Sequence, residues 1–139
     1  MEAEDGAGAH LNIGEAAGAS GVSAKMIRHY ESIGLVRPAR RSGAGYRLYG
    51  EHEVRVLQFI HRGRALGFSL EQIAGLLALW RDEQRASADV RELARRHIGE
   101  LDRKIAELEA MKRTLETLVR SCHGDQRSAC PILDDLAAH

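Results

Sequence analysis

A continuous helical pattern from Ala88 to Arg120 constrains the fold most, because this stretch contains one Gly and no Pro. Apolar residues recur along it at heptad spacing, with further apolar residues between them: Ala94, Ile98, Leu101, Ile105, Leu108, Met111, Leu115, Leu118 and Val119. This pattern predicts a coiled-coil seam. A helix about 50 Å long cannot bury such a seam against the short segment before it. The alternative, an intramolecular hairpin, lacks a second helix of matching length, so we predict a homodimer.

The N-terminal part predicts two short helices around a tight turn. Apolar residues at 13, 16, 17 and 19 fit a first helix, which ends at the turn 20–22. Ser23 is a good N-cap for a second helix over 24–33, and Gly34 stands where a helix commonly ends. Two helices in this arrangement are typical of a helix-turn-helix.

A two-stranded wing is predicted for Val36–Tyr49. Pro38, Gly43 and Gly45 interrupt any helix there, whereas the aromatic and branched residues beside them favour strands. The wing would carry a basic tip. Helices are then expected over 51–66 and, after the capping box Ser69–Gln72, up to about Trp80.

Charge is unevenly distributed. The chain has 20 basic and 20 acidic residues. Residues 20–64, however, contain nine Lys and Arg against three Glu, a net charge of +6. On the second helix, Lys25, Arg28 and His29 share one face. A local basic excess predicts a phosphate-binding surface, and an ordinary solvated charged face is the alternative.

Three motifs in this order resemble the MerR family of transcriptional regulators: Ile13–Ala17, Arg28–Leu35 and Gly45–Tyr49. The resemblance runs from about Leu11 to the C-terminus. It implies a mainly α fold, with a winged helix-turn-helix DNA-binding domain, a long antiparallel coiled-coil dimerisation helix and a C-terminal metal-binding loop. It also implies DNA contacts from the recognition helix and the wing by Lys25, Arg28, Tyr30, Arg41, Tyr46, Arg47 and Tyr49.

The domain organisation expected from these observations has four parts. Residues 1–10 form a disordered tail, 11–80 the DNA-binding domain with hinge helices, 81–120 a linker and the dimerisation helix, and 121–139 the metal-binding loop with a short terminal helix. The sequence has neither a signal peptide pattern nor an apolar run long enough for a membrane span. We therefore expect a cytoplasmic protein with no membrane partner.

The two cysteines of the chain, Cys122 and Cys130, bracket a short polar loop where the long helical pattern stops. Such a pair points to a soft metal ion or to redox chemistry. The loop is similar to that of the copper-responsive, CueR/HmrR-like branch of the family. Divalent-metal sensors of the family carry a cysteine at the start of the long helix, where this chain has Ser87. The resemblance therefore implies Cu(I) as the ligand, with Ag(I) or Au(I) as alternatives, one ion per two-cysteine site.

The charge of the site favours the same choice. Two thiolates and one monovalent ion carry a net charge of −1, which suits linear coordination by sulfur. Pro131 is well placed to begin a terminal helix over 131–137, whose N-terminus would face that charge. Zn²⁺ usually takes four ligands and would have to recruit His123, Asp125 or His139. A divalent-metal sensor using His123, a disulfide switch and structural cysteines remain alternatives.

Enzymatic function is not expected, because the sequence has no Gly-rich phosphate loop and no plausible Ser/His/Asp arrangement. The resemblance implies a regulator that binds promoters with an overlong spacer and distorts the DNA so that RNA polymerase can engage. Copper-efflux and detoxification genes are the implied targets. A thiol redox protein is a rival, as is a sensor of organic cations, although aromatic residues make up only 4% of the chain.

Overall fold

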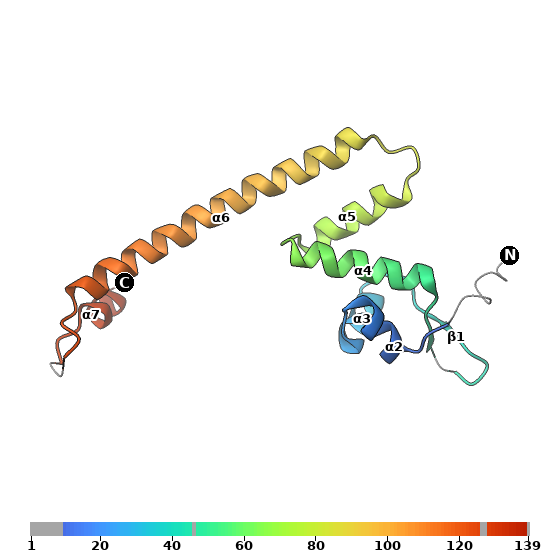
Figure 1. The fold of residues 1–139 in the computed structure, drawn as a ribbon, viewed down its shortest axis with the longest axis horizontal. Helices are drawn as coiled ribbons and strands as arrows, with labels where there is room; N and C mark the ends of the chain where they lie inside the picture. Colours follow the sequence, from blue (N-terminus) through green and yellow to red (C-terminus); the bar gives the residue numbers. More distant parts are fainter. Residues whose placement is uncertain (1–9, 46, 126–127, 139) are drawn as a thin grey trace. The chain divides into compact units, whose positions relative to one another are not determined.

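A computed structural model of the chain describes residues 10–45, 47–125 and 128–138 and is mostly helical (Figure 1). The predicted tail, apart from residue 10, lies outside the described residues, and so does Tyr46. Contacts divide the chain into two compact units, Met1–Arg85 and Ala86–His139. This boundary falls within the charged segment 81–86, which separates the predicted DNA-binding region from the long helix.

The first unit begins with the predicted helix-turn-helix. Helix α2 spans Ile13–Ser20 and helix α3 spans Ala24–Ser32. The Ser23 side chain caps α3 by accepting a hydrogen bond from the Met26 N–H at 3.1 Å. Gly21 ends α2 with a φ of 83°, a left-handed conformation that favours glycine, and its N–H donates to the Ala17 carbonyl.

The wing is a hairpin of two very short strands, β1 (Arg40–Arg41) and β2 (Arg47–Leu48), paired antiparallel. Arg40 stands opposite Leu48, and Arg41 stands opposite Arg47. An isolated bridge continues the pairing at its base, where the backbones of Leu11 and Tyr49 exchange two hydrogen bonds of 2.8 Å. This bridge ties the segment before α2 to the end of the wing.

Two further helices complete the core of the first unit. Helix α4 spans Glu51–Ala65, helix α5 spans Leu70–Arg81, and both α2 and α5 contact α4. The predicted capping box at the start of α5 is present. The largest fully buried side chains come from α3, α4, α5 and the end of the wing: Ile27, Tyr49, Leu57, Ile60, Ile73 and Leu77.

The second unit consists of helix α6 (Ser87–Ser121), a loop, and helix α7 (Pro131–Ala138), which contacts α6. Helix α6 has 35 residues and is therefore about 50 Å long. Much of its predicted seam is more than half exposed in the single chain: Ile98, Ile105, Leu108, Met111, Leu115 and Val119. Within the described part of the chain, none of the helices is both long and apolar enough to cross a membrane.

Candidate nucleic-acid interface and candidate metal loop

The two faces of α3 separate core from basic residues. Ile27 and Tyr30 are buried, whereas Lys25, Arg28 and His29 are exposed. This division follows the helical spacing of the sequence, in which positions three or four apart share a face. The exposed face presents the two cations that the family resemblance assigns to DNA.

The wing carries a second group of cations. Arg40 and Arg41 are exposed, and the Arg41 Nη1 donates to the Gly45 carbonyl at 3.0 Å, a contact within the wing itself. Gly45 has a φ of 89°, and its N–H donates to the Ser42 carbonyl, which closes the turn at the tip. The Arg41 side chain is thus held by the loop that it flanks.

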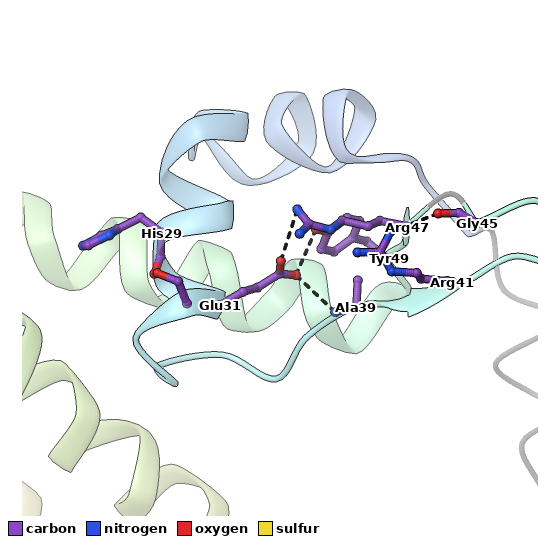
Figure 2. A network of polar contacts seen from close by, with 8 residues as sticks. His29, Glu31, Ala39, Arg41, Gly45, Arg47 and Tyr49 are labelled. Atoms are coloured by element: carbon purple, nitrogen blue, oxygen red, sulfur yellow. Dashed lines mark hydrogen bonds and ion pairs between the residues drawn. The ribbon is translucent and has the colours of Figure 1, made fainter.

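Arg47 differs from Arg41 because it is paired with an acid. Its Nη1 lies 3.4 Å from the Oε1 of Glu31, and 28% of the Arg47 side chain is exposed against 6% of the Glu31 side chain. Figure 2 shows Glu31 reaching from α3 toward Arg47 and Tyr49, whereas His29, on the same helix, points away from them. The guanidinium is thereby held at the junction between the recognition helix and the wing.

Tyr49 shares this carboxylate. Its hydroxyl donates to the Glu31 Oε2 at 2.9 Å, and the Ala39 N–H donates to the same oxygen at 3.1 Å. Burial, reinforced by the hydrogen bond and the negative charge of Glu31, raises the pKa of Tyr49 to about 12. The hydroxyl is therefore a donor throughout the physiological pH range, and Glu31 is its acceptor.

The predicted contact residues thus occupy different environments. Lys25, Arg28 and Arg41 are exposed and Arg47 is partly exposed, so all four cations reach the surface of the first unit. Tyr30 and Tyr49, by contrast, lie in the hydrophobic core, with 5% and 2% of their surface exposed. An aromatic side chain near basic residues is equally suited to both roles, and only tertiary packing distinguishes them.

Glu31 was not among the residues predicted for the interface, although the sequence held a signal. It is an acid in the last turn of a helix, within a strongly basic stretch. Carboxylates are disfavoured at helix C-termini because the helix dipole is negative there. An acid in such a position is better explained by contacts outside its own helix than by helix stability.

The second unit places the two cysteines at the ends of its two helices. Cys122 is the C-cap of α6 and donates its N–H to the Val119 carbonyl at 3.1 Å. The Cys130 carbonyl accepts the first hydrogen bond of α7, from the Asp134 N–H at 3.0 Å. Both thiols are free and half-buried, and Gly124, with a φ of 69°, turns the loop between them. Helix ends therefore fix both thiol-bearing residues.

The other residues considered for this site lie apart from the thiols in sequence or on the surface. His123 and Asp125 are exposed in the loop, and Ser87 is exposed as the first residue of α6. His139 lies outside the described residues. Over the ranges that the structure describes, no group of three His, Cys, Asp or Glu side chains is placed to hold a metal ion.

Comparison with known proteins agrees with the arrangement of the first unit and of α6. A family model described as MerR HTH family regulatory protein matches residues 11–79. A second, described as MerR, DNA binding, matches residues 54–118. Together they extend from the base of the wing through the helix-turn-helix, α4 and α5 into most of α6.

Relatives match over nearly the whole chain. "Heavy metal-dependent transcription regulator 2" of Rhizobium meliloti is 57% identical over 91% of this chain and 86% of its own length. "HTH-type transcriptional regulator HmrR" of Sinorhizobium medicae is 58% identical over the same shares. "HTH-type transcriptional regulator CueR" of Salmonella typhimurium is 39% identical over 91% of this chain and 92% of its own length.

Two solved structures resemble the fold along most of its length. The transcription regulator PbrR691 of Ralstonia metallidurans, crystallised with lead(II), has a TM-score of 0.77 at 35% identity and covers 91% of this chain and 98% of its own. MerR of Bacillus megaterium, crystallised with mercury(II), has a TM-score of 0.69 at 33% identity and covers 91% and 99%. This chain therefore belongs to the MerR family of DNA-binding transcriptional regulators and is not an enzyme.

Proposed function

We propose that this protein is a metal-responsive regulator that senses Cu(I), or the related ions Ag(I) and Au(I), through Cys122 and Cys130. The observation that carries the proposal is that the two thiols of the chain stand at the facing ends of α6 and α7. A ligand that joins them ties the C-terminus of α6 to the N-terminus of α7. Metal binding would thus change the mechanical state of the second unit.

The donor set fits a monovalent soft ion. Two thiolates supply a complete linear site for Cu(I), while the N-terminus of α7 presents backbone N–H groups toward the residual negative charge. Zn²⁺ would require further ligands. The relatives named CueR and HmrR support this choice. The lead and mercury complexes of the structural neighbours support a divalent ion as the second candidate, with His123 as its added ligand.

The exposed seam of α6 supports a homodimer. Its apolar side chains leave more than half of their surface in water in the single chain, although α7 already packs on α6. A twofold-related copy in antiparallel orientation would cover the seam and bring Ser87 of the partner subunit toward the cysteine loop. Ser87 would then influence metal selectivity by leaving that position without a third thiolate.

Promoter DNA is the proposed partner of the first unit. The four surface cations Lys25, Arg28, Arg41 and Arg47 are proposed to contact DNA, mainly its phosphates. The buried Tyr30 and Tyr49 contribute by fixing α3 and the wing, with any direct contact limited to their small exposed portions. Tyr46, at the wing tip, remains a proposed contact from the family resemblance.

Regulation would proceed through the shape of the DNA. A dimer presents two such surfaces, and metal binding would favour a conformation in which the bound promoter is distorted. RNA polymerase would then engage both promoter elements and transcribe copper-efflux and detoxification genes. Metal can act this way only if it binds the activating conformation more tightly than the other one.

X-ray absorption on the full-length protein tests the metal assignment, with Cu(I) and Zn²⁺ supplied in competition. The expected result is Cu(I) bound by two sulfur atoms without nitrogen, because the thiols alone complete the site. Zn²⁺ bound in preference, with a nitrogen ligand, would favour the divalent candidate and His123. Binding of neither metal would contradict the metal-sensing proposal.

Single substitutions test the role of each thiol. Cys122→Ser and Cys130→Ser should each abolish metal-dependent transcription from an operator selected in vitro from random DNA, with DNA affinity unchanged. Ser128→Ala, within the same loop, is the matched control and should respond normally. Full induction by either cysteine variant would rule out the two-thiolate site.

A further inference from the structure

Glu31 is a buried acid that joins three segments of the first unit. Only 6% of its side chain is exposed. From α3 it reaches the backbone of Ala39 just before β1, the guanidinium of Arg47 on β2, and the hydroxyl of Tyr49 at the end of the wing (Figure 2). The partners thus include residues on both sides of the wing.

The location of Glu31 is unfavourable in the absence of these partners. A carboxylate in the last turn of a helix faces the negative end of the helix dipole, which costs up to about 1 kcal/mol. A buried charge also needs hydrogen bonds or an opposite charge to offset the loss of water. Two hydrogen bonds and one ion pair supply that compensation, and every one of them comes from outside α3.

The wing, for its part, is poorly stabilised by its own pairing. Each strand has two residues, and an isolated hairpin of that size is at best marginal in water. The register also sets Arg41 directly opposite Arg47, and like charges in opposed positions repel. The negative charge of Glu31 next to Arg47 offsets this repulsion.

We propose that Glu31 is a positioning residue for DNA binding, which fixes the base of the wing against the end of the recognition helix and orients the Arg47 guanidinium. The proposal rests on the proposed contact between Arg47 and DNA phosphate. The ion pair is 3.4 Å long and engages Nη1, and the Arg47 side chain stays partly exposed. Glu31 therefore holds the arginine without enclosing it.

A double-mutant cycle on operator affinity tests this proposal, because two residues that act together give non-additive effects. In the wild-type background, Arg47→Ala should weaken binding about tenfold, as loss of one charged contact implies. It should also lower the slope of log affinity against log salt by about 0.9, the value for one phosphate. In a Glu31→Ala background, the same change should weaken binding only about twofold and leave the slope nearly constant.

Two further backgrounds separate positioning from charge and from loss of fold. Glu51→Ala removes an exposed acid of α4 and changes the net charge equally, so the full tenfold effect of Arg47→Ala should persist there. Tyr49→Phe removes one hydrogen bond of Glu31 but keeps the aromatic ring in the core. In that background the Arg47→Ala loss should be intermediate, about fourfold, even if Glu31→Ala fails to fold.

The outcomes are distinct. If Arg47→Ala costs tenfold in every background, Glu31 does not position Arg47 and the proposal is overturned, although the phosphate contact stands. If Arg47→Ala has no effect in the wild-type background, the phosphate contact itself is wrong and the proposal fails with it. A loss that shrinks only where the Glu31 contacts are removed supports the proposal.

Discussion

The exposed seam of α6 gives a quantitative prediction for dimer formation. Leu108 is the most exposed large apolar residue of the seam, with 62% of its surface in contact with water in the single chain. Replacing Leu by Ala removes three carbon atoms, and each buried methylene is worth about 0.8 kcal/mol. If the dimer buries the exposed fraction, Leu108→Ala costs about 1.5 kcal/mol for each protomer.

Twofold symmetry doubles this cost, because each dimer contains the substitution twice. A loss of about 3 kcal/mol corresponds to a roughly 100-fold increase in the dissociation constant of the dimer. Sedimentation equilibrium over a range of protein concentrations measures that constant directly. Circular dichroism of the same samples reports whether the helices remain folded.

Arg113→Ala is the matched control, since five residues along α6 place this side chain about 140° around the helix from Leu108. The control should leave the dissociation constant within about threefold of the wild-type value. A Leu108→Ala protein that also stays within threefold, with its helices intact, would refute the burial of this seam between two copies. The apolar stripe would then have to be covered in some other way.

Three further predictions concern stability and selectivity. Because the pKa of Tyr49 is raised from 10.0 to about 12, the stabilisation by its neutral hydroxyl is present below pH 10 and is lost as the pH rises toward 12. Urea unfolding at about pH 9 and about pH 11 should therefore show a larger loss of stability for the wild type than for Tyr49→Phe, and equal losses would contradict the assigned hydrogen bond. Gly63→Ala would place a Cβ atom 3.0 Å from the Ile73 Cγ1 and should destabilise the first unit by about 1–2 kcal/mol in urea melts. Gly75→Ala, which meets nothing within 4 Å, should be neutral or stabilising, and a loss there equal to that of Gly63→Ala would reject the steric explanation. Ser87→Cys should shift the metal preference from Cu(I) toward divalent ions in competition experiments, and an unchanged preference would argue against a role for position 87.

Local signals in the sequence predicted most of the helices. Ser23 caps α3 and Ser69 caps α5, as their side chains and spacing indicated. Gly34 follows α3 with a φ of 80°. The long helix begins at Ser87, one residue before the predicted start. Such features depend on neighbours a few positions away, which is why sequence alone identifies them.

The interface was harder to predict, because its organisation depends on contacts between distant segments. Tyr30 and Tyr49 were predicted to contact DNA, but both rings pack in the core. The role of Glu31 depends on a residue 18 positions further along the chain, the hydrogen-bond donor Tyr49. A sequence motif records that these residues occur together without distinguishing a ring in the core from a ring at the surface.

The length of α6 has a consequence for how the protein would report metal in a cell. Ser87 and Cys122 flank the same helix at opposite ends, about 50 Å apart, so a single chain cannot bring them to one site. Under the proposed antiparallel arrangement, a complete sensing site exists only after two chains have met. Metal binding and subunit association are then thermodynamically linked, and each favours the other. The metal concentration that triggers the response would consequently fall as the abundance of the regulator rises.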